Sequence, residues 1–419
     1  MGRIADRASA AIAKVEALGD MKGRIFTEFD PERILAAARE AEELTAANAD
    51  LPLAGLLVSV KDLYDEDGQR TTAASRLLAE REPAAKDSEV VRRMKAAGAV
   101  MFGRTTMSEF AYSGVGLNLH YGTPGSRYDE SVVPGGSTSG GALTVALGLC
   151  DIALGTDTGG SVRIPAAVNG IYGFKPTQVS VPLDGVHALS PTLDSAGPLA
   201  ADLATTIAAY EVMSGTPRPA MRTERKLRLA IPVGALTNDL DTKVAADWDA
   251  ALAVLRKADH ELVELDVEFL GQAGRMIGMI IATEAHAQYS RHFQALETVG
   301  DPHVLRRMRF AEVLSKQDVD AAYRARTALV ARFSEVMTGF DALVAPTLRI
   351  NPPRIVDVEA DFDRWNLSIL RNTGIINAAD GCAITMPAPS EAGQFPAAIM
   401  LANARGRDWD VLRAAKMLG

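Results

Sequence analysis

The chain has 419 residues, of which 47% are hydrophobic and 23% charged, as in ordinary globular proteins that bury a sizeable core. Its formal net charge is −9 and its Lys and Arg residues form no dense block, which disfavours direct binding to DNA or RNA. The N-terminus is charged from Arg3 onward without an apolar signal segment, and no apolar stretch reaches the roughly 20 residues that cross a bilayer. We therefore expect a cytoplasmic protein that does not associate with a membrane.

An N-terminal helical arm over about residues 1–50 is the first predicted feature. Residues 2–17 and 31–47 have the spacing of amphipathic helices. The second helix is expected to begin with Asp30 as its cap and Pro31 in the first helical position.

A buried strand is predicted next. Leu56–Val60 is a compact apolar run rich in β-branched residues, and Lys61 stands at its end. A helix capped by Asp87 or Ser88 follows, and then a short strand at Val100–Phe102. This order is the start of a β-α-β alternation.

The alternation continues to the end of the chain. It comprises a helix after Asp202, a strand at Leu227–Ile231, a helix from Asp241 to about Lys257, a strand at Leu262–Leu265, mostly helical residues 270–338, and strands at Ala342–Ala345, Ala383–Met386 and Ala397–Leu401. Such a pattern predicts an α/β fold, which we expect to be an α/β/α sandwich with a large mixed, mostly parallel central sheet. We find no internal repeat, and Gly215–Arg225 is a candidate surface loop, so one domain over 1–419 is expected.

Metal and disulfide sites are disfavoured by the residues available. Cys150 and Cys382 are far apart and lack CxxC partners, so buried free thiols are expected. The six histidines show no HExxH spacing. We therefore expect neither a metal nor a cofactor.

Two segments rich in glycine and serine are the main candidates for chemistry. Residues 134–141 read Pro-Gly-Gly-Ser-Thr-Ser-Gly-Gly, and residues 155–165 read Gly-Thr-Asp-Thr-Gly-Gly-Ser-Val-Arg-Ile-Pro. Successive backbone N–H groups in such turns can converge on negative charge, so both segments could bind an oxyanion or a phosphate. Either one alone would more often be a simple tight turn.

Two familiar motifs do not fit these segments. A phosphate loop needs GxxxxGK[ST], and no lysine follows either glycine cluster in that position. A GxSxG nucleophile elbow needs glycine two residues after the serine, where Arg163 follows Ser161 and Ser139 follows Ser137.

The segment 134–177 resembles the signature of the amidase signature family, and Leu53–Asp62 is similar to the family's lysine-bearing strand. The resemblance covers nearly the whole chain and is dense over a signature core of about 53–200. It implies a catalytic triad of Lys61, Ser137 and Ser161. The two serines lie at the family's spacing of 24 positions (161 minus 137), which the choice of Ser139 would break.

The resemblance also implies how the triad is supported. It implies a cis peptide bond between Gly136 and Ser137 and an oxyanion hole formed by the N–H groups of Thr158, Gly159, Gly160 and Ser161. Asp157 and Arg163 resemble the family's supporting ion pair, although Arg163 could instead bind a carboxylate of the substrate. Thr138 departs from the serine or glycine of many members but keeps a hydroxyl group.

A lysine can act as the base for a serine only when it is neutral. That requires its pKa to fall by roughly 3 units from about 10.4 through burial. The end of an apolar strand suits this role for Lys61, whereas an isolated lysine would more often extend to solvent.

These observations predict an amidohydrolase, a hydrolase of carbon–nitrogen bonds other than peptide bonds, that cleaves a small-molecule amide through an acyl-enzyme on Ser161. A carbamate, urea-type or ester hydrolase is the alternative within the family, and the amidase subunit of a tRNA-dependent amidotransferase ranks lower. A homodimer is a candidate assembly. The substrate pocket is expected from residues 107–133 and 340–385, including Met107, Phe110, Tyr121 and Trp365.

Overall fold

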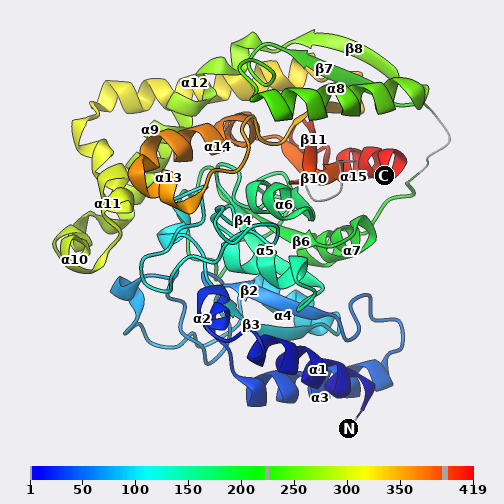
Figure 1. Cartoon of the computed structure of the whole chain (residues 1–419), viewed down its shortest axis with the longest axis vertical. Helices are drawn as coiled ribbons and strands as arrows, with labels where there is room; N and C mark the ends of the chain where they lie inside the picture. The colour runs from blue at the N-terminus through cyan, green and yellow to red at the C-terminus, as the bar shows by residue number, and fades with distance from the viewer. Residues whose placement is uncertain (1, 222–225, 389–394) are drawn as a thin grey trace.

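The computed structural model describes residues 2–221, 226–388 and 395–419. Eleven strands in this part of the chain form one sheet with helices against it (Figure 1). In order across the sheet the strands are β1 (Phe26–Glu28), β3 (Val100–Thr105), β2 (Leu57–Lys61), β4 (Ile152–Asp157), β6 (Ser195–Ala200), β5 (Tyr172–Lys175), β10 (Cys382–Ala388), β11 (Ala397–Asn403), β9 (Ala342–Pro346), β7 (Arg228–Val233) and β8 (Glu261–Asp266).

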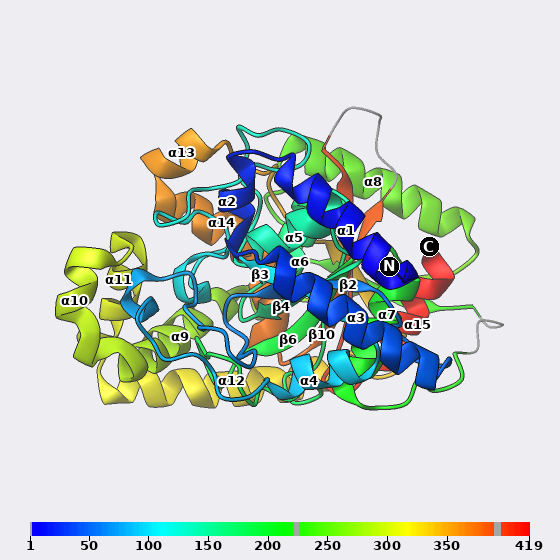
Figure 2. The ribbon, with the colours of Figure 1, turned by 90° about the horizontal axis from the view of Figure 1, so that it is seen from below.

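The helices follow the predicted alternation. They are α1 (Arg3–Glu16), α2 (Met21–Ile25), α3 (Pro31–Ala47), α4 (Glu89–Ala96), α5 (Ser139–Ala146), α6 (Arg163–Asn169), α7 (Leu203–Ser214), α8 (Thr242–Lys257), α9 (Ala273–Tyr289), α10 (Phe293–Val299), α11 (Pro302–Arg309), α12 (Lys316–Val336), α13 (Ile355–Ala360), α14 (Phe362–Ala378) and α15 (Asp408–Leu418). Helices α5 and α6 lie on one side of the central strands, and α4, α7 and α15 lie on the other (Figure 2). None of the helices in the described ranges is long and apolar enough to cross a membrane.

The α/β fold with a mixed sheet is confirmed, but the expectation of a mostly parallel sheet is wrong. Of the ten neighbouring strand pairs, four are parallel and six are antiparallel. A crossover helix enforces parallel pairing only between the strands it connects. Two antiparallel pairs, β5–β6 and β10–β11, join consecutive strands, and others such as β5–β10 join strands distant in the sequence. The predicted β-α-β alternation constrains the direction of neither kind, because it places no crossover helix between the paired strands.

Capping residues and loop composition predicted several features of the fold correctly. Asp30 caps α3 by accepting hydrogen bonds from the N–H groups of Glu32 and Arg33, and Pro31 is the first residue of the helix. Ser88, rather than Asp87, caps α4. The predicted loop Gly215–Arg225 is irregular as far as residue 221, and residues 222–225 lie outside the described part.

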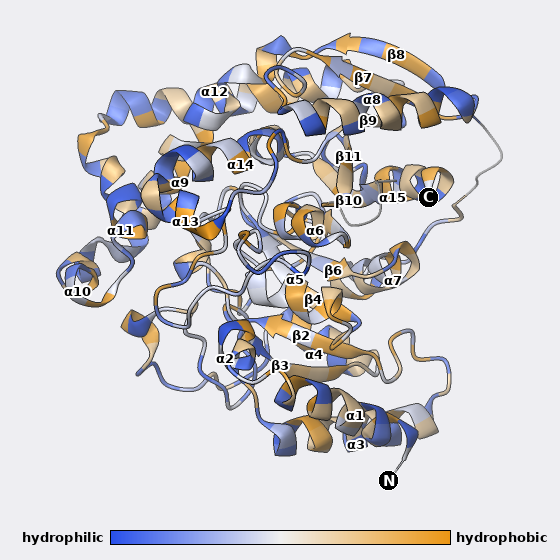
Figure 3. Ribbon diagram, in the orientation of Figure 1, coloured by the Kyte–Doolittle hydropathy of each residue, from blue (hydrophilic) through white to orange (hydrophobic). Residues whose placement is uncertain are grey.

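The core explains why the central strands are apolar throughout. All five residues of β2 and all six of β4 are buried, because helices cover both faces of the sheet. Figure 3 shows hydrophobic residues along these strands and mixed hydropathy on outer helices such as α12. Cys150 and Cys382 are buried free thiols, as expected.

The polar site residues lie at one edge of this core. Strands β2 and β4 are parallel neighbours, so their carboxyl ends meet, and they end at Lys61 and Asp157. The turn before α5 and the loop between β4 and α6 lie at this same edge, beneath α14.

Candidate active site

Lys61 is fully buried at the carboxyl end of β2. Its Nζ donates to Ser137 Oγ at 2.8 Å and to Thr156 Oγ1 at 3.0 Å. Burial lowers the pKa of Lys61 to about 7, against the opposing charges of Asp157 and Asp194. At neutral pH a substantial share of this amine is therefore unprotonated and able to accept a proton.

Ser137 stands in a tight turn that only glycine neighbours allow. The Gly136–Ser137 peptide bond is cis, as the family resemblance implies. A Cβ on Gly136 would lie 2.5 Å from the backbone nitrogen of Gly116, so the turn needs glycine here. The nearby Ser139 Oγ is buried and has no hydrogen-bond partner among the described residues.

Ser161 lies in the loop that joins β4 to α6 and is 3% exposed. This loop is adjacent to the Ser137 turn, because the N–H of Thr138 donates to the carbonyl of Ser161 at 3.3 Å. Within the described residues, however, no hydrogen bond joins Ser161 Oγ to Ser137 Oγ or to any other side chain. The structure thus brings Lys61 and Ser137 into direct contact and places Ser161 next to them.

The backbone of the same loop offers free donors. In the parts of the chain that the structure describes, the N–H groups of Thr158, Gly159, Gly160 and Ser161 donate to no other group. Gly160 has φ +141°, and a Cβ there would lie 2.1 Å from Thr373 Oγ1, so glycine is required. Four unpaired amides beside a serine hydroxyl are chemically able to bind an oxyanion.

Asp157 and Arg163 form a fully buried ion pair on either side of this loop. Arg163 Nε and Nη2 donate to the two carboxylate oxygens at 3.0 and 2.9 Å, and Nη2 also donates to the carbonyl of Thr373 and to Asn377 Oδ1. Although burial opposes the charged form, Arg163 holds the pKa of Asp157 at about 2. Because Arg163 is enclosed, it is not available to bind a substrate carboxylate.

Sequence reasoning missed the helix that fixes this loop. From α14, Thr373 Oγ1 donates to the carbonyl of Gly159 at 2.7 Å, and Asn377 Nδ2 donates to Asp157 Oδ1 at 2.8 Å. No motif marks these residues, which are 214 and 220 positions from their partners. Only the folded chain brings them together.

Asp194 is a second missed residue. It accepts a hydrogen bond from Thr158 Oγ1 at 2.6 Å and from the N–H groups of Leu189 and Ser190. Burial raises the pKa of Asp194 to about 6, and its charge acts on Lys61. It lies within the signature core of about 53–200, where the family resemblance is dense, and this was the available signal.

A cavity of about 420 Å³ opens above Ser161. Its floor includes Thr158, Gly159 and Ser161, and its other walls come from residues 111–113 and from α9, α11 and α14. In Figure 1 these three helices lie together beside the central strands. The cavity is large enough for a small-molecule substrate and gives it access to the serine.

The predicted pocket residues need correction. The ranges 107–133 and 340–385 do contribute, through residues 111–113 and 367–375, but none of Met107, Phe110, Tyr121 and Trp365 lines the cavity. Met107 and Phe110 are buried in the main core instead. The contribution of α9 and α11 was not anticipated, because their helical pattern carries no mark of a site.

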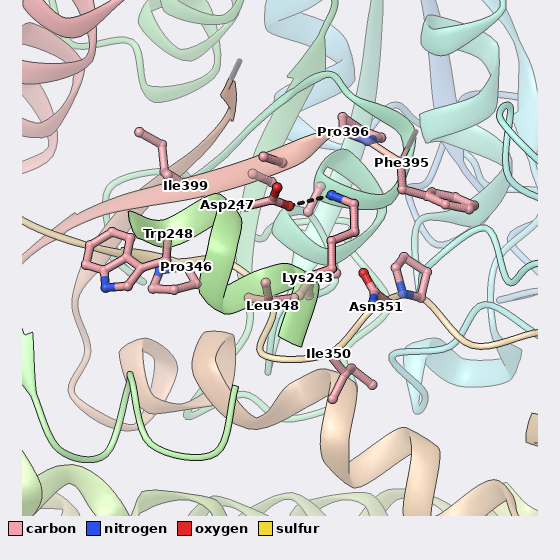
Figure 4. A pocket seen from close by; sticks show the side chains of 15 residues that line it. Lys243, Asp247, Trp248, Pro346, Leu348, Ile350, Asn351, Phe395, Pro396 and Ile399 are labelled. Atoms are coloured by element: carbon pink, nitrogen blue, oxygen red, sulfur yellow. Dashed lines mark hydrogen bonds and ion pairs between the residues drawn. The ribbon is translucent and has the colours of Figure 1, made fainter. Parts of the chain in front are cut away.

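A second hollow, drawn in Figure 4, lies away from these residues. Lys243 and Asp247 of α8 form an ion pair at its wall, beside Phe395 and Pro396. Its volume of about 40 Å³ holds only a few water molecules, and none of the candidate catalytic residues lines it.

Comparisons with known proteins agree with this fold. A family model described as Amidase matches residues 8–412. A 2-amino-5-chloromuconic acid deaminase from Comamonas testosteroni is 33% identical over 421 residues, covering 95% of this chain and 90% of that protein. One of the subunits of the glutamyl-tRNA(Gln) amidotransferase from Chloroflexus aurantiacus is 35% identical over 363 residues, covering 77% of this chain and 74% of that protein. A crystal structure of an amidase superposes with a TM-score of 0.89 at 26% identity, covering 100% of this chain and 96% of that one.

Proposed function

Since the chain belongs to the amidase family and is a hydrolase of carbon–nitrogen bonds other than peptide bonds, we propose that it cleaves a small-molecule amide through an acyl-enzyme on Ser161. Ser137 acts as the proton relay and Lys61 as the base. The observation that carries this proposal is the 2.8 Å hydrogen bond between the buried Lys61 Nζ and Ser137 Oγ.

The first step forms the acyl-enzyme. Ser161 Oγ attacks the amide carbonyl while its proton passes to Ser137 Oγ, whose own proton passes to neutral Lys61 Nζ. Catalytic hydrogen bonds are often long in a free enzyme and shorten when substrate is bound. The proposal is therefore compatible with the absence of a hydrogen bond between Ser161 Oγ and Ser137 Oγ in the described structure. The free N–H groups of residues 158–161 stabilise the negative charge that develops on the carbonyl oxygen.

The remaining steps return the proton and release the acid. The Lys61 ammonium gives its proton back through Ser137 to the leaving nitrogen, so the C–N bond breaks and the amine departs. Water then attacks the ester on Ser161 by the same proton route, which yields the carboxylic acid and restores the serine. The ion pair Asp157–Arg163 keeps the loop in place during both halves of the reaction.

The same acyl-enzyme route would serve a carbamate, a urea-type substrate or an ester. The cavity above Ser161, at about 420 Å³, favours a small molecule over a macromolecular substrate. We therefore favour a free-standing small-molecule amidase over a subunit of an amidotransferase complex as the function of this chain.

A fluorophosphonate probe tests the proposal. We expect intact-protein mass spectrometry to find one phosphonyl adduct, and peptide mapping to place it on Ser161. Ser161→Ala should abolish the adduct, whereas Ser139→Ala, which alters a buried serine outside the triad, should keep it. An adduct on Ser137, Ser139 or a cysteine would contradict the assignment.

A further inference from the structure

The cavity above Ser161 has an unusual charge for this acidic chain. Its charged lining residues are three arginines, Arg275 on α9, Arg307 on α11 and Arg371 on α14, and no acidic residue lines it in the described part of the chain. The whole chain has a net charge of −9. Three cations from three helices therefore make the electrostatic potential of the cavity positive.

Arg307 is held in position without a carboxylate partner. It donates to the carbonyl of Tyr112, and its guanidinium lies 4.2 Å from the centroid of the Tyr112 ring. No acidic side chain in the described ranges forms an ion pair with it, and burial lowers its pKa. This guanidinium is oriented before any ligand arrives, and its charge is only partly compensated.

Arg371 and Arg275 are more open. Arg371 is 45% exposed, and its one ion-pair partner in the described structure, Asp239, is 3.4 Å away and also contacts Arg349. Arg275 is exposed and forms no ion pair with a described residue. Both side chains can turn toward an anion in the cavity at little cost.

Apart from the three arginines, the helical wall of the cavity is apolar. Ile277, Ile281 and Leu370 line it, together with glycines of α9 and α14. We propose that the substrate is an amide that also carries a carboxylate, with its carbonyl at Ser161, its hydrocarbon part on this wall and its carboxylate on the three arginines. This rests on the proposed hydrolase function and adds the substrate class. A guanidinium matches a carboxylate in shape and charge, and Arg163 cannot take this role because it is enclosed.

The test compares monoamides of linear dicarboxylic acids with neutral alkyl amides of the same length. The readout is the ratio of kcat/KM for the acid to that for the neutral amide. We expect this ratio to exceed one for at least one chain length. Each of Arg275→Gln, Arg307→Gln and Arg371→Gln should lower it by about tenfold or more, because a hydrogen bond to a charged group is lost.

The matched controls are Arg→Gln variants outside the cavity, which make the same change of charge. Arg364→Gln on α14 and Arg324→Gln on α12 alter exposed arginines that do not line the cavity, so the ratio should stay at the wild-type value. If Arg307→Gln fails to fold because it anchors Tyr112, the two exposed positions still decide the matter.

Two results would overturn the inference: a wild-type ratio of one or less at every length, or a ratio that neither Arg275→Gln nor Arg371→Gln changes. Fluorophosphonate labelling of Ser161 in the wild type separates this failure from that of the proposed function. Labelling with no preference for acids removes only the substrate class, whereas absence of labelling removes the hydrolase mechanism.

Discussion

The floor and the roof of the cavity differ in how deeply their side chains are buried. We call the floor the groups on β2, in the 134–141 turn and in the β4–α6 loop, and the roof the lining residues of α9, α11 and α14. In the floor, Lys61, Ser137 and Arg163 are fully buried, and each has a hydrogen-bond partner. In the roof, Leu367 is 67% exposed and the Arg371 side chain 45% exposed.

Two arginines make the difference concrete. Arg163 is enclosed by Asp157, Thr373 and Asn377, so its charge serves to fix the loop. Arg371 has one ion-pair partner in the described structure, Asp239 at 3.4 Å, and lines the cavity. The floor therefore has one geometry suited to one reaction, and the roof can vary in shape and charge. Changes in the floor should affect every substrate alike, and changes in the roof should affect substrates differently.

Ser161→Ala is the strongest test of the floor. Without the nucleophile, kcat/KM should fall on the order of 10⁶-fold, the magnitude seen when another serine hydrolase loses its nucleophile. The loss should be the same for acidic and neutral amides, measured by steady-state kinetics with both. Ser161→Ala that lowers activity toward only one substrate class would break the proposed division between floor and roof.

Lys61→Ala should lower kcat/KM by about 10² to 10⁴, the usual contribution of general acid–base catalysis. In the wild type, kcat/KM should rise with pH through about 7 and then level off, because the ammonium cannot accept a proton below the pKa of Lys61. Lys61→Ala should remove this rise. A folded Lys61→Ala protein with the wild-type pH profile would refute the lysine base.

A double variant sharpens this result. Because Lys61 and Ser137 lie on one proton path, Lys61→Ala combined with Ser137→Ala should cost much less than the product of the two separate losses. Strictly multiplicative losses would mean that the two residues act independently. Circular dichroism spectra that match the wild type provide the control for folding.

Asp157→Asn should destabilise the floor by about 3 to 5 kcal/mol, because it leaves the buried Arg163 charge without its partner. The sign of the pH dependence follows from the pKa of about 2 in the fold against 3.8 for the free side chain. The stabilisation from Asp157 is present above 3.8 and is lost as the pH falls toward 2. Denaturant unfolding at neutral and acidic pH measures both effects.

A matched control exists on the surface. Asp357 forms a bidentate ion pair with Arg354, but the Arg354 side chain is 62% exposed and that of Asp357 37% exposed. Asp357→Asn should change the free energy of unfolding far less than Asp157→Asn. Equal losses would show that burial does not distinguish the two pairs.

The sequence predicted the floor better than the roof, for a physical reason. Lys61, Ser137 and Ser161 stand in short motifs whose glycines are required by close backbone contacts, as at Gly136 and Gly160. Because these contacts require glycine at fixed positions, they can be recognised as a motif in the sequence. The strand directions and the roof depend on which distant elements pack together, and a helical pattern such as that of α9 says nothing of what it faces.

Asn377 illustrates this limit. It hydrogen-bonds to Asp157 across 220 positions, and its only sequence context is an ordinary amphipathic helix. Conversely, Trp365 was expected in the pocket as part of the range 340–385, yet it packs on a separate apolar cluster. Residue type alone does not reveal which face of α14 meets the cavity.

Gly278→Leu tests the roof. A Cβ at Gly278 would have no neighbour within 4 Å, so a larger side chain can extend into the cavity without disturbing the core. We expect kcat/KM for long substrates to fall by about tenfold and that for the shortest amide to change less. The free energy of unfolding should not fall, because leucine favours a helix more than glycine does. An equal loss of kcat/KM for substrates of every length would mean that Gly278 affects all substrates alike, as a residue of the floor is expected to do.

Asp194→Asn should give the smallest effect, a shift of the pH profile with the reaction intact. Asparagine can keep its oxygen toward the N–H groups of Leu189 and Ser190 and donate from its amide NH2 to Thr158 Oγ1, so the loop should hold its shape. The negative charge of Asp194 raises the pKa of Lys61 against the larger effect of burial, which lowers it. Removing that charge should lower the pKa of Lys61 further, so the rise in kcat/KM should move to lower pH. The plateau should keep most of its height, and the ratio of activity on acidic and neutral amides should not change, because Asp194 does not line the cavity. A shift to higher pH would contradict the electrostatic link between Asp194 and the base, and a changed substrate ratio would contradict the separation of floor from roof.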